Sequence, residues 1–481
     1  MSDAALWSRW WASRSGHGRS FRGSACRAVR REPSVAERSR RASVPLVLGV
    51  LALVGCTSGR ESSEAAPSQS VTSSTTASSN TPGASTSPDS SASTVVPGSR
   101  TVTVSGGIGS GSYRPGTTVH VWSSVSTTNG VTRGWSGDEE LLAEPNEWHT
   151  TFVMPDRDVE LVAGTSAQTV SLTVETTNGV TAIPKTVRYF FPPAMRGLVL
   201  FSHGTGGSSR FIESTEAFPV ALAFVADGYG VISTESEETA AGDLNGDGKE
   251  RWITRPVSDN VDLGNLQVLF QSFQDRGLVP AGSPKFALGM SAGGSFSHAL
   301  GTLGDTAAAP AFPQLRFAAV AGYCSDSTAA RSGNRSSTPS AWFMCGAEDN
   351  PEVSNTEARA NEAAMRARGI PTDYLEHAPS PLYDQRFTRI NGIDGATSTA
   401  MAAELRTAEF VDAVGFITVD GDEIARRVLA DPDAFPTIMS SPSANEVRNQ
   451  IKVMRAEHSM YADATRRNVD FFDRFNPNGQ R

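Results

Sequence analysis

A serine between two glycines is the first feature of this sequence that could do chemistry. Gly289-Met-Ser-Ala-Gly293 has the pattern G-x-S-x-G, and an apolar run, 285–288, directly precedes it. A helix can begin at Gly293, so the pattern predicts a strand, a sharp turn that holds out Ser291, and a helix. The start of such a helix directs backbone N–H groups toward developing negative charge. This arrangement suits a serine nucleophile in acyl transfer, with the N–H of Ala292 as one donor to the oxyanion.

A second glycine-rich turn could supply the other donor. The apolar run 197–202 ends in His203-Gly-Thr-Gly-Gly207. Acyl transfer needs two N–H groups that converge on one oxygen, and we expect the second from Thr205 or Gly204. We interpret His203 as structural, because it stands before the glycines and not after the acid.

The acid should follow the serine in the chain. We predict Asp349, in the turn after the apolar run 341–345, with Glu348 and Asp326 as alternatives. The competing interpretation is that Asp349 only caps the helix expected from Asn355.

The base should come last. We predict His458, which ends a strand-like run, 451–458, and precedes a terminal helix, 463–475. His377, at the end of a predicted strand 372–376, is the alternative. We expect His120, His149 and His298 to be structural, because they precede the acid or lie outside the domain.

The elements that must position these residues alternate between strands and helices from residue 166 onward, which is typical of a parallel α/β sheet. The further predicted strands are 187–191, 231–234, 285–290 and 317–323, and the predicted helices are 218–227, 259–276, 293–303 and 355–368. Between the two candidate bases, the spacing of Met401, Leu405, Phe410 and Val414 predicts helices in residues 378–450. We interpret that segment as a cap over the pocket.

These motifs and the order Ser…Asp…His resemble the α/β-hydrolase superfamily over residues 166–481, and more loosely its secreted esterases of the polyhydroxybutyrate-depolymerase and feruloyl-esterase type. The resemblance implies an α/β-hydrolase sheet with a helical cap insertion. It also implies a triad of Ser291, His458 and Asp349, an acyl-enzyme intermediate and no organic cofactor.

Residues 99–165 predict a small all-β module of short runs separated by Gly- and Pro-containing turns. Gly106–Gly116, Gly134-Trp-Ser-Gly-Asp138 and Met154–Val159 occur there in the order of a divergent internalin-type bacterial B-repeat, which this segment resembles. The resemblance implies a β-grasp-like spacer or adhesion module. A generic β spacer is the alternative.

The N-terminus predicts export. Residues 1–55 are Arg-rich and end in an apolar run, and Leu53-Val-Gly-Cys56 resembles a lipobox in which Cys56 is lipidated. A simple signal peptide is the alternative. The Ser/Thr/Pro-rich segment 56–98 predicts a disordered tether. We therefore expect a protein that is lipid-anchored on the outer face of a bacterial cell membrane, or of an outer membrane.

Charge and composition exclude several classes of function. The 481 residues carry a net charge of −9, whereas proteins that bind nucleic acid through phosphates are commonly basic. A single apolar run, near the N-terminus, excludes a polytopic membrane protein.

Two further features leave alternatives open. With Cys26 removed and Cys56 lipidated, Cys324 and Cys345 are an even pair that predicts a disulfide, or two buried thiols. The segment Asp243-Leu-Asn-Gly-Asp-Gly248 offers Asp243, Asn245 and Asp247 as a calcium loop, but position twelve is Thr254 in place of Glu, and a turn is the alternative.

The leading hypothesis is therefore a lipid-anchored serine hydrolase that cleaves carboxylic esters, either small or polymeric. A serine peptidase on the same fold and a non-catalytic surface-binding lipoprotein remain alternatives. A non-catalytic domain would have lost the serine, the acid, the histidine or the oxyanion glycines, and the sequence offers candidates for all four.

Overall fold

The computed structural model describes residues 98–123, 130–326, 336–346, 353–441 and 443–479. The predicted signal segment 1–55, the lipidation site Cys56 and the tether up to residue 97 lie outside these ranges, so those assignments remain predictions. In the described part of the chain, no helix is long and apolar enough to cross a membrane.

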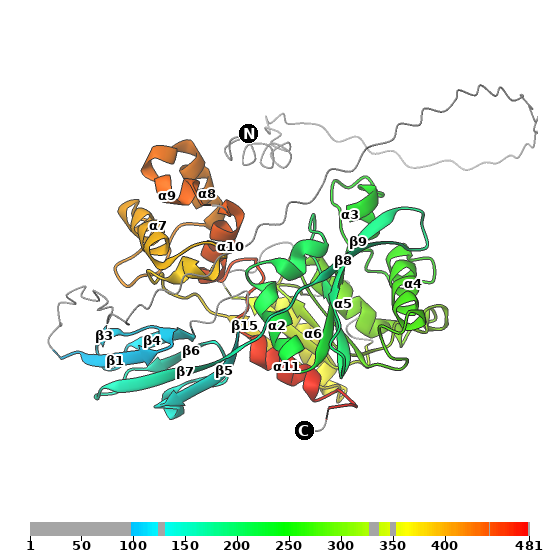
Figure 1. Cartoon of the computed structure of the whole chain (residues 1–481), viewed down its shortest axis with the longest axis horizontal. Coiled ribbons are helices and arrows are strands. Elements are labelled where there is room, and N and C mark those ends of the chain that lie inside the picture. Colours follow the sequence, from blue (N-terminus) through cyan, green and yellow to red (C-terminus); the bar gives the residue numbers. More distant parts are fainter. Residues whose placement is uncertain (1–97, 124–129, 327–335, 347–352, 442, 480–481) are drawn as a thin grey trace, which may run out of the picture. The chain divides into compact units, whose positions relative to one another are not determined.

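An eight-stranded sheet forms the centre of the α/β part of the chain (Figure 1). Its strand order is β8-β9-β11-β10-β12-β13-β14-β15, and within the sheet β9 alone runs in the opposite direction to the other strands. Central strands such as β10 are buried along their whole length because helices cover both faces. The predicted mostly parallel α/β sheet is observed. The strands are β8 (Thr173–Asn178), β9 (Pro184–Phe190), β10 (Gly197–Ser202), β11 (Tyr229–Thr234), β12 (Lys285–Met290), β13 (Phe317–Tyr323), β14 (Ser340–Cys345) and β15 (Thr372–His377).

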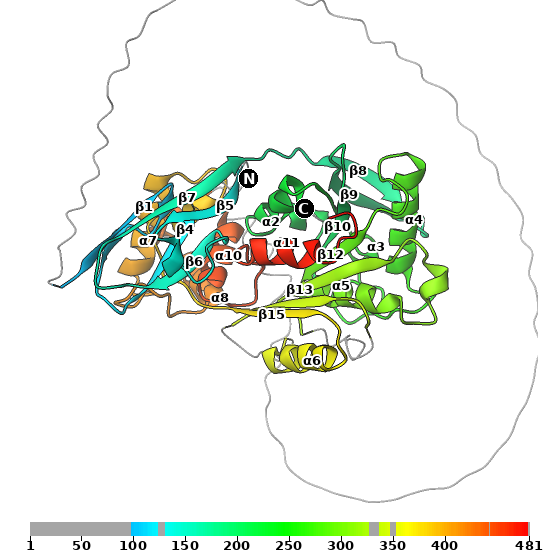
Figure 2. The ribbon, with the colours of Figure 1, turned by 90° about the horizontal axis from the view of Figure 1, so that it is seen from below.

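Helices cover both faces of this sheet, and each face has its own hydrophobic core. Val199 and Phe201 of β10 pack with α2 and α11, whereas Leu198 and Leu200 pack with α4 and α5. Figure 2 shows α2 and α11 on one side of the sheet and α6 on the other. The bounds are α2 (Ala217–Ala226), α3 (Glu237–Ala241), α4 (Val261–Asp275), α5 (Ala292–Leu303), α6 (Asn355–Ala367) and α11 (Thr465–Asp473), with short 3-10 turns η2 (Ser209–Glu213) and η3 (Ala309–Ala311).

The predicted N-terminal β module consists of two small sheets, with strand orders β3-β1-β7-β5 and β2-β4-β6. Apolar side chains from both sheets, including Val121, Trp135 and Phe152, form one core between them. The elements are β1 (Arg100–Ser105), β2 (Gly107–Ile108), β3 (Gly111–Tyr113), β4 (Thr118–Ser123), β5 (Gly130–Gly137), η1 (Glu139–Leu141), β6 (His149–Val153) and β7 (Val159–Ala167).

The β module is not a detached spacer, because buried polar groups join it to the start of α11. The carboxylate of Glu147 accepts the backbone N–H groups of Arg466 and Arg467 at 2.9 and 2.6 Å. The indole Nε1 of Trp148 donates to Oδ1 of Asp463 at 3.0 Å. The module and the α/β part therefore share one buried boundary.

The segment between β15 and α11 is helical, as predicted, and has a core of its own that includes Phe387, Leu405 and Ile424. The prediction of a strand-like run over 451–458 is wrong. Residues up to Met454 belong to α10, whose buried positions Ala444, Val447, Ile451 and Met454 follow a helical period. The elements are η5 (Arg386–Arg389), α7 (Gly395–Thr407), α8 (Gly421–Ala430), η6 (Pro432–Ala434), α9 (Pro436–Met439) and α10 (Ala444–Met454).

Candidate active site

Ser291 lies on a strained turn between β12 and α5. Its backbone has φ +56° and ψ −121°, a region that residues with a side chain rarely occupy. The turn is held in place because the N–H of Ser291 donates to the carbonyl of Tyr323 in β13 at 2.9 Å. The strand–turn–helix predicted from G-x-S-x-G is therefore observed, with the serine at the carboxyl edge of the sheet.

Close packing explains why glycine follows the serine at position 293. A Cβ atom on Gly293 would lie 2.1 Å from the carbonyl oxygen of Ser202 and 2.5 Å from that of His203. Only a residue without a side chain lets α5 begin this near the end of β10. The contact also brings the loop after β10 next to Ser291.

The three predicted oxyanion residues lie around the serine. Thr205 and Ala292 line the same cavity as Ser291, and a Cβ on Gly204 would lie 3.5 Å from the Cβ of Ser291. Ala292 is the first residue of α5, so its N–H has no partner within the helix. The geometry therefore gathers two glycine-rich turns and a helix N-terminus at one serine.

A cavity of about 710 Å³ opens beside Ser291. Half of its lining residues come from the segment after α3, which carries several charged side chains and which the sequence did not assign to the active site. The lining residues are Thr205, Glu238, Leu244, Asn245, Lys249, Arg251, Trp252, Ile253, Thr254, Arg255, Ser291, Ala292, Ser295, Ser325, Asp326 and Val353. No residue of the helical insertion is among these described lining residues. The insertion is thus present, but the predicted position over the pocket is not observed.

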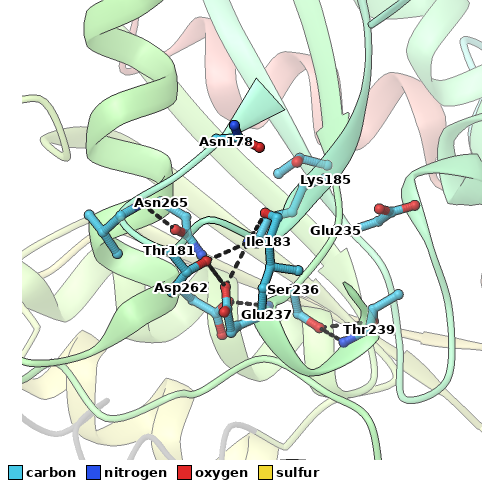
Figure 3. A network of polar contacts seen from close by, with 12 residues as sticks. Asn178, Thr181, Ile183, Lys185, Glu235, Ser236, Glu237, Thr239, Asp262 and Asn265 are labelled. Atoms are coloured by element: carbon cyan, nitrogen blue, oxygen red, sulfur yellow. Dashed lines mark hydrogen bonds and ion pairs between the residues drawn. The ribbon is translucent and has the colours of Figure 1, made fainter. Parts of the chain in front are cut away.

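A buried polar network anchors that wall (Figure 3). Lys185 Nζ lies 2.6 Å from Oε2 of Glu237, and both side chains are almost fully buried. Asp262 accepts the backbone N–H groups of Glu237 and of the cavity residue Ile253 at 2.6 and 2.7 Å, although burial raises its pKa to about 6. The network therefore ties α3, α4 and the cavity wall together.

The predicted acid cannot be placed, because Asp349 and its alternative Glu348 lie outside the described residues. The other alternative, Asp326, is buried at the cavity and follows β13. Its Oδ2 accepts the N–H of Ser354 at 3.0 Å, and its backbone carbonyl accepts the side-chain amide of Asn361 at 2.8 Å.

The two candidate bases have different surroundings. His377 is buried, with Nε2 3.0 Å from the carbonyl of Val453, Nδ1 3.6 Å from Asp463, and its ring stacked on Tyr461. Burial lowers the pKa of His377. His458 is partly exposed in the segment that leads to α11, and its Nδ1 is buried without a hydrogen-bond partner in the described structure. His458 therefore has a ring nitrogen available for an acid, whereas both nitrogens of His377 already face acceptors.

The predicted Cys324–Cys345 disulfide is not formed: both residues are free, buried cysteines at the ends of β13 and β14. The thiol of Cys324 donates to the carbonyl of Ser459 at 3.1 Å, and burial raises its pKa. The neighbouring side chains of Cys324 and then His458 lower the pKa of Cys345. The alternative interpretation, two buried thiols at strand ends, describes this structure.

The other histidines in the described residues make structural contacts. The ring of His203 is buried. Its Nδ1 lies 2.8 Å from the carbonyl oxygen of Gly204, its Nε2 accepts the N–H of Ser236 at 3.2 Å, and burial lowers its pKa to about 4. The ring of His298 in α5 stacks on the ring of Trp342 in β14. In the β module, Nδ1 of His120 lies 3.0 Å from Nε2 of His149. None of these four is among the residues that line the cavity.

The candidate calcium loop is a turn stabilised by its own side chains. The carboxylate of Asp243 accepts the N–H groups of Gly246 and Gly248 at 2.8 and 2.6 Å, and Asn245 accepts that of Asp247. Asp247 in turn pairs with Arg251. These contacts are those of a turn, and the calcium site stays a prediction.

No protein-family model matches the chain. A search of curated proteins also gives no match. Among solved structures, the chain is similar to a puromycin-hydrolyzing peptidase of Mycobacterium tuberculosis, with 18% identity, TM-score 0.30, and coverage of 43% of this chain but 35% of the peptidase. It is also similar to Thermogutta terrifontis esterase 2 phosphorylated by paraoxon, with 14% identity, TM-score 0.32, and coverage of 43% of this chain and 81% of the esterase. A third similar structure is dienelactone hydrolase of Anabaena variabilis, with 16% identity, TM-score 0.30, and coverage of 50% of this chain and 97% of the hydrolase.

Proposed function

We propose that this protein is a serine hydrolase that cleaves carboxylic esters. The observation that carries the proposal is the strained position of Ser291, at φ +56° between β12 and α5 and on the wall of a cavity of about 710 Å³. Strain of this kind persists where the surrounding structure enforces it, and it clusters at active sites. Thr205 and Ala292 on the same wall supply candidates for both oxyanion donors.

In the proposed mechanism, His458 removes the hydroxyl proton of Ser291 as the oxygen attacks the ester carbonyl. The negative charge that develops on the carbonyl oxygen is stabilised by backbone N–H groups of Ala292 and of Thr205 or Gly204. His458 then gives its proton to the leaving alcohol, and an acyl-enzyme remains on Ser291. Water, activated by the same histidine, releases the carboxylic acid. Asp349 is the proposed acid that orients the imidazole.

The experiment that tests this proposal is hydrolysis of short- and medium-chain p-nitrophenyl esters by the purified protein beside its Ser291→Ala variant. We expect turnover by the wild type and its loss in the variant. A fluorophosphonate probe should label Ser291 in the wild type. Absence of both turnover and labelling would refute the hydrolase and favour the surface-binding lipoprotein, and cleavage of peptide amides with no ester turnover would favour the peptidase.

The proposed location is the outer face of a bacterial membrane, with Cys56 as the lipid attachment site. This part of the proposal rests on the lipobox-like sequence 53–56 alone. It is tested by metabolic labelling with a fatty acid and by membrane fractionation of cells that make the protein or its Cys56→Ala variant. Labelling that persists in the variant would contradict it.

A further inference from the structure

Two thiols and an imidazole meet at the carboxyl edge of the sheet. Ligand atoms of Cys324, Cys345 and His458 all lie within 4.8 Å of one another, and in the described part of the chain this is the one group of three or more His, Cys, Asp or Glu side chains close enough to hold a metal ion. The residues come from the ends of β13 and β14 and from the segment before α11. Three separate parts of the chain are thus brought to one point.

From this cluster, we propose that Cys324, Cys345 and His458 form a binding site for a thiolate-preferring divalent cation such as Zn²⁺ or Cd²⁺, and that its occupation inhibits the active site. The inhibition rests on the proposed function, because His458 is the proposed base. The binding itself does not.

The donor set fits such a cation. Thiolate sulfur and imidazole nitrogen are the ligands that zinc takes in proteins, at about 2.3 and 2.0–2.1 Å. With those bond lengths, tetrahedral geometry places two sulfurs about 3.8 Å apart, so donors already within 4.8 Å need to move by on the order of 1 Å. Three protein ligands leave a fourth position open for water.

The surroundings of His458 also suit a metal ligand. Nδ1 of His458 is buried and has no hydrogen-bond partner in the described structure. A buried polar atom without a partner is costly, and a metal ion or an acid would satisfy it. Both sulfurs are buried, since Cys324 is fully buried and Cys345 is 3% exposed, so a reagent reaches them only when this part of the structure opens, and a bound cation opposes that opening.

Metal binding at this place would stop the proposed chemistry. In a serine triad, one ring nitrogen accepts the serine proton while the other donates to the acid. A cation on either ring nitrogen of His458 takes the place of the serine proton or of the acid, and it withdraws electron density from the ring, so that the other nitrogen becomes a weaker base. Coordination requires thiolates, so binding releases the protons that the thiols still carry and tightens as the pH rises.

The test uses Cd²⁺ as the probe, on the full chain with Cys26→Ser and Cys56→Ser in reducing buffer, so that Cys324 and Cys345 are the remaining thiols. We expect one equivalent of Cd²⁺ to produce a thiolate–cadmium ultraviolet band. It should protect both cysteines from iodoacetamide, as mapped by mass spectrometry. Ester hydrolysis should fall in parallel and return after chelation.

Variants separate the site from other effects. Cys324→Ser and Cys345→Ser should each weaken Cd²⁺ binding about hundredfold or more, since each removes a soft ligand. Ser459→Ala, next to His458 but without a ligand atom, is the matched control and should bind as the parent does. If a cysteine variant fails to fold, protection of Cys324 and Cys345 by Cd²⁺ in the parent protein still shows whether these residues bind the cation.

Each contrary outcome has its own meaning. No cadmium band and no protection would overturn the site. Binding without a loss of hydrolysis would overturn the coupling to His458. Binding and protection in a protein without any ester turnover would leave the metal site supported, and would count against the proposed function instead.

Discussion

Nδ1 of His149 lies 2.9 Å from Oδ2 of Asp463, so a strand of the β module and the segment before α11 share a buried hydrogen bond. Asp463 also accepts from Trp148 and lies 3.8 Å from the guanidinium of Arg389. Burial opposes ionisation of this carboxyl, but His149, His377 and Arg389 together hold its pKa well below the usual range. One carboxylate thus joins the module, the helical insertion and the α/β part.

Asp463→Ala should therefore destabilise the whole chain. The change leaves Trp148 and His149 without their acceptor and removes a negative charge from beside Arg389, and breaking a buried ionic contact costs about 3–5 kcal/mol. Denaturant unfolding measures the loss. The control is Asp470→Ala on α11, which is 57% exposed in its pair with Arg466 and whose loss should cost about 1 kcal/mol or less. Equal effects of the two variants would contradict the role given to Asp463.

The two candidate bases should respond differently to alanine. His458→Ala should lower kcat for ester hydrolysis about a thousandfold or more with little change in Tm, as expected for removal of a catalytic base. His377→Ala should mainly lower Tm, because it removes a buried ring stacked on Tyr461. Kinetics and thermal unfolding of both variants check this. Loss of activity in a stably folded His377→Ala protein, with His458→Ala active, would reverse the assignment.

Gly293→Ala should abolish activity and lower stability sharply, because its Cβ would lie 2.1 Å from the carbonyl oxygen of Ser202. The backbone there must move, and with it the turn that presents Ser291. Gly395→Ala is the matched control, since a Cβ at Gly395 would meet no atom within 4 Å. Soluble yield, Tm and fluorophosphonate labelling of both variants measure the outcome. Normal labelling of Gly293→Ala would show that the packing is looser than these distances imply.

Lys185→Met should weaken the wall of the cavity. Glu237 would stay buried without its cation, at a cost of about 3–5 kcal/mol in the free energy of unfolding. Lys452→Met makes the same chemical change in a pair with the half-exposed Asp422, where about 1 kcal/mol or less is expected. Denaturant unfolding compares the two variants, and a cost for Lys185→Met no greater than the control's would argue against the network.

Glu147 should make stability depend on pH. Burial raises its pKa to about 8 from 4.5, so the folded state retains a proton that the unfolded state loses. Burial of Glu147 costs no stability below pH 4.5. Between pH 4.5 and about 8 it lowers the free energy of unfolding by about 1.4 kcal/mol per pH unit, and above pH 8 the loss does not grow further. Glu147→Gln should flatten the fall in stability between pH 5 and 8, whereas the exposed Glu139→Gln should not. The free energy of unfolding at several pH values measures this, and parallel curves for Glu147→Gln and the wild type would contradict it.

Much of the α/β sheet could be predicted from sequence because its central strands are short apolar runs bounded by glycine or polar residues. Strands β10, β12 and β13 begin and end where the pattern placed them. The same reasoning failed at Ile451–His458, since a short apolar run does not distinguish a strand from the last turn of a helix. The helical period became visible only with Ala444 and Val447 included.

The site was predictable only where local sequence carries the signal. Ser291, Gly204, Thr205 and Ala292 come together because each belongs to a turn with a recognisable pattern. Asp463 could not be predicted, because its partner His149 is 314 positions away and a single aspartate has no periodicity. The wall residues Lys249, Arg251 and Arg255 were not predicted for a similar reason: their loop is held in place by bonds to other parts of the chain, among them those of Asp262 and Glu238.

The position of α11 affects how this chain can fold during synthesis. The core that contains Val199 and Phe201 is completed by Val469 and Phe472, more than 250 residues later in the chain. While the ribosome is still making the helical insertion, that face of the sheet has no α11 to cover it. Incompletely covered apolar faces are prone to aggregation and are ligands for chaperones. The nascent protein is therefore expected to depend on a holding chaperone until its last helix emerges.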